Sequence, residues 1–213
     1  MIAGQIQKLT ESLPKDVTLV AVSKTKPNSA IEEAYGVGHR DFGENKVQEL
    51  CQKAEELPKD IRWHMIGHLQ RNKVKYIAPF VHLIHGVDSE RLLAEINKQG
   101  VRNDRVIDVL IQLHIAEESS KFGFSYDEAA SLFSNENLYP NVRVVGLMGM
   151  ATFTEDKTQI TREFETLSTF YNTWKAQKSL SVLSMGMSND YPIAIAMGSN
   201  MIRVGSLIFG RRN

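Results

Sequence analysis

The sequence predicts a single α/β domain built as a (β/α)8 TIM barrel, and three observations support this fold class. Eight short β-rich runs recur along the 213 residues, and segments with helical spacing separate them. The longest runs are apolar at nearly every position, as expected of strands covered on both faces. Eight repeats favour closure into a barrel over an open, doubly wound sheet. No linker-like stretch divides the chain, so residues 1–213 are expected to form one domain.

The predicted strands are short, and polar or turn residues bound them. In chain order they cover residues 17–23, 41–44, 63–67, 83–87, 106–115, 142–150, 182–187 and 201–205. The first is a run of Val, Thr, Leu and Ala, and the next three are brief apolar runs that end near glycine or acidic residues. The fifth and sixth are the most continuous apolar runs. The last two lead into turns of glycine and serine.

Helical patterns fill the intervals between these strands. Apolar residues recur at three- and four-residue spacing around 47–54, 92–96 and 160–171. Two capping boxes, Ser29 with Glu32 and Ser125 with Glu128, predict helix starts. Gly36 and Gly100 are expected at helix C-termini, in the left-handed conformation.

The turn after the first strand argues against a dinucleotide-binding open sheet. Such a fold needs a glycine-rich turn at this place. The chain has Ser23-Lys24-Thr25-Lys26-Pro27 instead. The barrel is therefore preferred, and the open sheet is the alternative.

Charge and hydropathy exclude several classes of partner. The 25 basic residues balance the 25 acidic ones, so no overall field attracts nucleic acid or an anionic membrane. The first residues lack the basic and apolar regions of a secretory signal, and no run is apolar enough to span a membrane. We expect a cytoplasmic protein that binds neither nucleic acid nor membrane.

Lys24 is the first candidate for chemistry, because it stands where the first strand meets its loop. Reactive groups of such barrels gather at the C-terminal ends of the strands. Alternation along the strand places Val20, Val22 and Lys24 on one face, so an inward-facing Lys24 points into the barrel mouth. An apolar strand end desolvates the amine, which lowers its pKa and makes it a better nucleophile.

Two turns near the end of the chain are candidates for a phosphate site. Residues 184–188 lead from the seventh strand toward a helix that Pro192 would start well, and residues 203–206 follow the eighth. Phosphate sites of these barrels lie after strands seven and eight. Either turn alone is compatible with an ordinary tight turn. Together with Lys24 they describe a pocket for pyridoxal phosphate, which needs an amine and an anion site.

Segments along the whole chain resemble one known family. The matching stretches are Leu19-Val-Ala-Val-Ser-Lys-Thr-Lys-Pro27, Asp41-Phe-Gly-Glu-Asn45, Trp63-His-Met-Ile-Gly67 with Leu69, Gln70, Asn72 and Lys73, Gly146-Leu-Met148, Ser184-Met-Gly-Met-Ser188 with Asp190, and Ile202-Arg-Val-Gly205 with Ile208-Phe-Gly210. On these residues the chain resembles the pyridoxal phosphate homeostasis protein family. The resemblance implies a barrel of the alanine racemase N-terminal type, pyridoxal phosphate fold type III.

The resemblance also implies roles for individual residues. Lys24 matches the lysine that forms the internal aldimine with pyridoxal 5'-phosphate, and Asn45 is expected near the ring. Ser188, Gly205 and Ser206 match the phosphate-binding turns, and Ser206 keeps the hydroxyl of the threonine that is often found there.

Arg203 matches an arginine expected near the pyridine nitrogen. A fixed cation keeps that nitrogen unprotonated and makes the ring a poor electron sink. Related racemases carry a second, β-rich domain with catalytic groups, whereas this chain ends at Asn213, shortly after the eighth predicted strand. We therefore expect a monomer without catalytic residues that holds pyridoxal 5'-phosphate and takes part in vitamin B6 and amino-acid homeostasis. Its expected partners are the cofactor, free amino acids and pyridoxal-phosphate-dependent apoenzymes.

Two enzymatic alternatives remain open. A pyridoxal-phosphate-dependent amino-acid racemase would need a second base at the mouth, such as His64 or Tyr191. A cofactor-free aldolase would use Lys24 on a sugar phosphate, and an absence of cofactor colour would favour it.

No metal site is expected. His64 and His68 have a spacing that suits zinc on a helix, but on a strand their Cα atoms lie about 13 Å apart. His82, His85 and His114 lack cysteine or carboxylate companions at metal spacing. Core or surface roles are expected for them.

Overall fold

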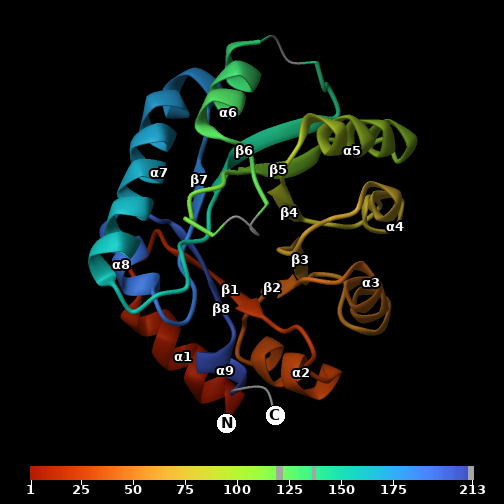
Figure 1. Ribbon diagram of the computed structural model, residues 1–213. Coiled ribbons are helices and arrows are strands. Elements are labelled where there is room, and N and C mark those ends of the chain that lie inside the picture. The colour runs from red at the N-terminus through yellow and green to blue at the C-terminus, as the bar shows by residue number, and fades with distance from the viewer. Residues whose placement is uncertain (119–121, 136–137, 211–213) are drawn as a thin grey trace.

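The computed structural model is a closed barrel of eight parallel strands, which confirms the predicted fold class (Figure 1). It describes residues 1–118, 122–135 and 138–210. Each strand pairs with the next along the chain, and β1 closes the ring on β8. The strands are β1 (Thr18–Val22), β2 (Asp41–Glu44), β3 (Arg62–Met65), β4 (Leu83–Val87), β5 (Ile107–Gln112), β6 (Val142–Met148), β7 (Val182–Ser184) and β8 (Met201–Val204).

The second and fourth strands have the predicted bounds, but several others are shorter than predicted. The largest difference is in β5, which covers Ile107–Gln112 instead of residues 106–115, and β7 ends at Ser184 instead of Met187. Gly186 follows with φ of 97°, a conformation that leaves the strand. Apolar residues after the strand ends line the barrel mouth instead of continuing the ladder, so their composition did not reveal where pairing stops.

Helices cover the outside of the ring. They are α1 (Ile2–Ser12), α2 (Asn28–Gly36), α3 (Val47–Glu56), α4 (Val74–Ile77) with the 3-10 turn η1 (Arg71–Lys73) before it, α5 (Glu90–Arg102), α6 (Tyr126–Ser134), α7 (Lys157–Lys178), α8 (Tyr191–Ala196) and α9 (Ser206–Phe209). From opposite ends of the chain, α1 and α9 pack side by side (Figure 1).

The capping predictions are partly right. Ser125 and Glu128 form the predicted capping box at α6. The box predicted for Ser29 and Glu32 is wrong, because α2 already begins at Asn28 and Pro27 occupies the cap position. Gly36 and Gly100 are both helical, so the left-handed prediction is wrong for each. Gly100 is needed for packing instead: a Cβ there would lie 2.8 Å from the carbonyl oxygen of Asn141.

The barrel has two apolar layers. A large cluster fills the space between strands and helices, with Phe42, Leu50 and Phe164 fully buried in it. A small second cluster lies inside the ring and consists of Val20, Leu83, Leu110, Met148 and Met201. The inner layer is small because polar side chains from β3, β4, β7 and β8 share the barrel interior.

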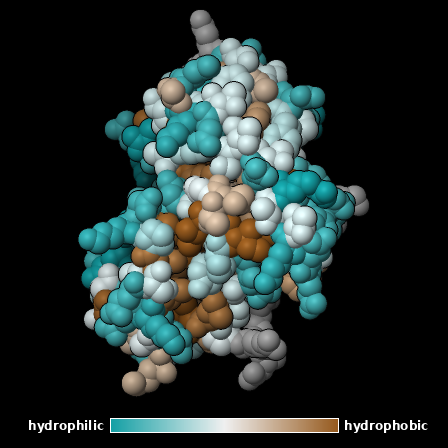
Figure 2. All heavy atoms as spheres, turned by 90° about the vertical axis from the view of Figure 1, so that its left-hand side faces the viewer, coloured by the Kyte–Doolittle hydropathy of each residue, from teal (hydrophilic) through white to brown (hydrophobic). Residues whose placement is uncertain are grey.

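Outer surfaces are mixed in polarity. On the side drawn in Figure 2, apolar residues gather in the middle of the molecule and polar residues surround them. Within the described ranges, no helix is both long and apolar enough to cross a bilayer.

Candidate functional site

All six predicted site residues line one pocket at the C-terminal ends of the strands. They are Lys24, Asn45, Ser188, Arg203, Gly205 and Ser206. The pocket encloses about 580 Å³, a volume typical of small-molecule sites. Its lining includes the cations Lys24, Lys26 and Arg203 and the carboxylate of Asp190. This surplus of positive charge suits an anionic ligand.

Lys24 lies two residues after the end of β1 and is half-buried at the pocket wall. Val22, two residues earlier, lines the same pocket, as the alternation along the strand predicts. Lys26 lies in the loop, as expected, and its Nζ donates to the carbonyl oxygen of Phe209 at 2.9 Å. The two lysines therefore share the pocket but differ in their anchoring, since one follows the strand and the other belongs to the turn.

A buried ionic network behind β1 holds the backbone on either side of Lys24. Lys53, on α3, donates to the carbonyl oxygen of Ser23 at 2.9 Å and to Glu44 Oε1 at 2.8 Å. Ser23 Oγ also donates to Glu44 Oε1, at 2.6 Å. Thr25 N donates to Glu49 Oε1 at 2.6 Å, and Glu49 pairs with Lys53 as well. The residues flanking Lys24 are thus tied to β2 and α3.

One carboxyl group of this network, that of Glu44, has a raised pKa. The side chain of Glu44 is fully buried, and desolvation raises its pKa, although hydrogen bonds from Lys53 and Ser23 offset part of that effect. Thr25 has φ of 65°, an unusual conformation for a β-branched residue. The bond to Glu49 holds Thr25 in this turn between Lys24 and Lys26.

The turns after β7 and β8 meet at the other side of the pocket. Gly205 N donates to Ser188 Oγ at 3.3 Å, so the two turns are bonded to each other. Asp190 stabilises the first turn, because its Oδ1 accepts from Met187 N at 2.6 Å. Gly186 has to be glycine for two reasons: φ is 97°, and a Cβ would lie 2.6 Å from that of Ala194. Small residues here let backbone N–H groups approach a bound anion.

Arg203 is buried where the pocket meets the barrel interior. It is 4% exposed, and its Nη1 donates to Ser184 Oγ at 2.6 Å while Nη2 donates to the carbonyl oxygen of Gly149 at 3.1 Å. Desolvation lowers its pKa to about 10, against an opposing effect of Asp190. The guanidinium therefore stays charged at neutral pH, held by two acceptors of no formal charge.

Asn45 and His68 lie along the rim formed after β2 and β3. Gly67 permits close packing against Asn45, since a Cβ on Gly67 would lie 2.6 Å from the carbonyl oxygen of Asn45. His68 stacks on Phe122 with ring centroids 4.1 Å apart, and its Nδ1 lies 3.0 Å from Asp88 Oδ2. His68, which follows the third predicted strand, is a titratable residue of the pocket that is not among the six predicted site residues.

His64 and Tyr191, the second bases considered for a racemase, are not among the described residues that line the pocket. His64 lies inside the barrel, 1% exposed, between Asp41 and His85. Tyr191 packs against the outer apolar cluster. Neither is placed to reach a ligand directly.

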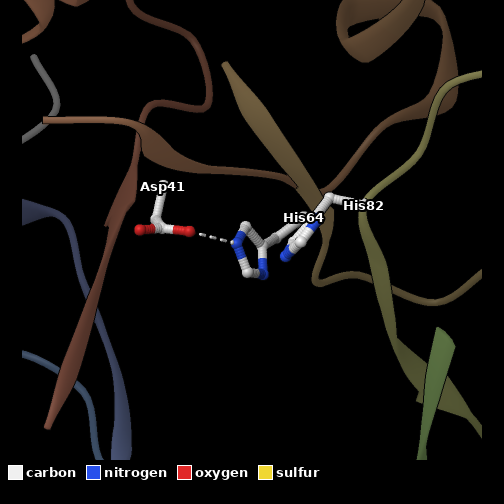
Figure 3. A group of neighbouring side chains, drawn as sticks. All are labelled: Asp41, His64 and His82. Atoms are coloured by element: carbon white, nitrogen blue, oxygen red, sulfur yellow. Dashed lines mark hydrogen bonds and ion pairs between the residues drawn. The ribbon is translucent and has the colours of Figure 1, made fainter. Parts of the chain in front are cut away.

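At the opposite end of the barrel, Asp41, His64 and His82 lie close together (Figure 3). The expectation that His82 has no carboxylate companion is wrong, because side-chain atoms of the three residues lie within 4.8 Å of one another. Asp41 already has hydrogen-bond partners: Arg62 donates to both of its carboxylate oxygens, and His64 Nε2 lies 3.0 Å from Oδ1. Sequence spacing could not find this group, since it depends on the pairing of β2 with β3 and on the loop before β4.

Comparison with known proteins agrees with this geometry. The family model for the alanine racemase N-terminal domain matches residues 1–213. The pyridoxal phosphate homeostasis protein of Aquifex aeolicus is 39% identical over 217 residues, which cover 99% of this chain and 95% of that protein. This chain belongs to the pyridoxal phosphate homeostasis protein family. The Escherichia coli member is 37% identical over 94% of this chain and 88% of its own.

Solved structures place the family in a wider fold group. PipY of Synechococcus elongatus, solved with pyridoxal phosphate bound, has a TM-score of 0.90 and 34% identity, and the match covers 99% of this chain and 100% of PipY. Alanine racemase of Bartonella henselae has a TM-score of 0.77 at 13% identity, over 99% of this chain and 60% of the racemase. The latter likeness shows a shared fold.

Proposed function

We propose that this protein binds pyridoxal 5'-phosphate at the barrel mouth, attaches it covalently to Lys24, and serves the homeostasis of this cofactor without efficient catalysis. The observation that carries the proposal is the presence of Lys24 and the Ser188 and Gly205 turns in one pocket. Members of the family that share more than a third of its sequence are named for this homeostasis. PipY has been solved with the cofactor bound.

The residues of the pocket fit this cofactor. Its phosphate would be held by Ser188, Gly205 and Ser206, where hydroxyl and backbone N–H donors converge in the bonded turns after β7 and β8. When bound, the cofactor supplies an aldehyde that bonds to a primary amine. Lys24 is that amine, and Asn45 contributes to the ring site. Arg203 presents a charged guanidinium instead of a carboxylate, which disfavours electron withdrawal into the ring.

The direct test measures absorbance of the protein with pyridoxal 5'-phosphate, before and after borohydride. Lys24→Ala removes the proposed attachment point, and Lys26→Ala is the matched control because Lys26 lines the same pocket. We expect a visible band that borohydride bleaches in wild type and Lys26→Ala and that is absent in Lys24→Ala. Absence of the band in wild type would return the cofactor-free aldolase to consideration.

Lack of efficient catalysis is tested through α-proton exchange of amino acids in deuterated water. His68 is the pocket histidine and pairs with Asp88, so it is the group best placed to act as a base in the racemase alternative. We expect exchange far slower than in dedicated racemases and unchanged in His68→Ala. Rapid exchange that His68→Ala abolishes would establish the racemase.

The proposed cellular role is that of a cytoplasmic monomer that exchanges the cofactor with free amino acids and with pyridoxal-phosphate-dependent apoenzymes. A half-buried lysine at an open mouth is accessible to competing amines, which supports release by exchange. Loss of the visible band on addition of an amino acid, with recovery of activity in an added apoenzyme, is the expected outcome. Light scattering would test the monomer.

A further inference from the structure

A file of buried polar side chains crosses the barrel interior from its base to the pocket. It begins at Asp41 on β2, whose Oδ1 lies 3.0 Å from His64 Nε2. His64 Nδ1 lies 2.9 Å from His85 Nε2, and His85 Nδ1 lies 3.2 Å from Ser184 Oγ. Arg203 Nη1 then donates to Ser184 Oγ at 2.6 Å. Only the last of these side chains lines the pocket.

The protons of this file have one consistent arrangement when both imidazoles are neutral. Asp41 is ionised, because hydrogen bonds from Arg62 and His64 outweigh desolvation and hold its pKa well below the ordinary value. His64 must then donate from Nε2 and accept at Nδ1. His85 in turn donates from Nε2 and accepts at Nδ1, so the Ser184 hydroxyl donates to His85 while its oxygen accepts from Arg203.

Every bond therefore points the same way, from Arg203 to Asp41. A proton placed on His64 Nδ1 would reverse the direction of the hydrogen bonds between His64 and Ser184. His85 would then have to donate from Nδ1 to Ser184 Oγ, and the Ser184 hydroxyl proton would point away from His85. The orientation of Ser184, the acceptor for Arg203 Nη1, thus depends on the state of residues at the far end of the barrel.

The surroundings make this dependence strong. The file passes through the inner apolar cluster, where Val20, Leu83 and Met148 exclude water, and an unpaired polar group would be costly. Burial lowers the pKa of His85 well below its usual value, and the nearby charge of Arg203 acts in the same direction. His85 therefore stays neutral, and the donor direction of the buried hydrogen bonds sets the orientation of the Ser184 hydroxyl beside Arg203.

We propose that His64 and His85 are positioning residues for the pocket: through Ser184 they fix the orientation in which Arg203 meets the bound cofactor. The proposal rests on the proposed function for the ligand, but the arrangement of the file stands on the protein alone. Because the file begins at Asp41, the base of the barrel (Figure 3) has an influence on ligand affinity through this residue.

Other titratable or charged groups also face this file. At the base these are His39, Arg62, His82 and Asp108, and near Arg203 it is Asp190. His82 packs edge-on against His64 with ring centroids 5.3 Å apart, yet it stands beside the file and not within it. It therefore provides a control for a general disturbance of the barrel base.

The arrangement of protons is tested by nitrogen NMR of the histidine rings in wild-type protein without added cofactor. At neutral pH we expect His85 to carry its proton on Nε2 and to keep Nδ1 bare. A proton on Nδ1, or an imidazolium, would overturn the proposal. This readout does not require that the protein bind pyridoxal phosphate.

The effect on the pocket is tested with Ser184→Ala, His85→Leu and His85→Gln, with His82→Gln as the control. Loss of one hydrogen bond in the file should weaken pyridoxal 5'-phosphate binding roughly 3- to 10-fold in Ser184→Ala and His85→Leu and shift the visible band. His85→Gln retains a donor and an acceptor and should recover part of the loss, whereas His82→Gln should match wild type.

Folded Ser184→Ala with wild-type affinity and an unchanged band would refute the positioning role, and this variant decides the matter if His85→Leu does not fold. If wild type binds no pyridoxal phosphate, the proposed function fails, and the NMR result still decides the arrangement of the file.

Discussion

Replacement of Lys53 by Met should cost more stability than loss of any exposed lysine. The ammonium group touches the carbonyl oxygen of Ser23, Glu44 and Glu49, and the Lys53 and Glu44 side chains are 6% and 0% exposed. Removing one partner of a buried ion pair leaves the other charge uncompensated, which costs about 3–5 kcal/mol. For a chain of this length that corresponds to a melting temperature lower by ~10 °C.

The pH dependence follows from Glu44. Burial already raises its pKa, and the variant loses the hydrogen bond that most offsets this effect, so the pKa rises further. A carboxyl group whose pKa is raised by folding stabilises the protein while protonated, and that stability is lost as pH rises through the folded-state pKa. The deficit of Lys53→Met should therefore be small near pH 5 and full at pH 8.

Urea unfolding at the two pH values measures this deficit. Lys98→Met, which removes an exposed lysine from α5, is the matched control and should change the unfolding free energy by less than about 0.5 kcal/mol. The double variant with Glu44→Gln should regain much of the loss, because the buried charge is gone. A deficit under about 1 kcal/mol at pH 8, or one that does not vary with pH, would refute the reasoning.

Three further predictions concern other buried groups. Asp41→Asn should lower the unfolding free energy by about 1–3 kcal/mol at pH 7. Because the pKa of Asp41 is held well below its ordinary value, its contribution is present above about pH 4 and lost in more acid solution, so unfolding curves of wild type and variant should converge there. Gly146→Ala should cost about 3 kcal/mol in urea unfolding, since a Cβ would lie 1.8 Å from the carbonyl oxygen of Val182; a near-neutral result would contradict this packing of β6 on β7. The Tyr126 hydroxyl is buried and has no hydrogen-bond partner among the residues that the structure describes, and burial raises its pKa to about 12. Tyr126→Phe should keep or slightly raise stability and remove the ionisation at the highest pH from a spectrophotometric tyrosine titration. A clear loss of stability would instead reveal a hydrogen-bond partner of the hydroxyl.

The barrel and the composition of its mouth could be predicted because both depend on short-range patterns. Alternation along the first strand put Lys24 on one face with Val20 and Val22, and the rule that reactive groups gather at strand C-termini pointed to the barrel mouth. The family resemblance supplied the roles expected of Asn45 and Arg203. Strand ends were predicted less well. Met185, for example, continues the apolar composition of β7 after the strand has ended, because it is buried in the large apolar cluster between strands and helices.

The buried polar groups could not be predicted, since their contacts depend on the closure of the ring. His85 meets Ser184 across the barrel, 99 positions away in sequence. Lys53 did leave a signal: it is three residues after Leu50 and four before Leu57, so it stands on the apolar face of α3. A lysine in that place indicates a buried partner, which the structure identifies as Glu44.

The most direct test of the central claim is peptide mass spectrometry of the protein after incubation with pyridoxal 5'-phosphate and reduction with borohydride. We expect one modification, on the side chain of Lys24 and not on that of Lys26, which lies two residues later. Modification of Lys26 alone, or a protein left unmodified, would contradict that claim.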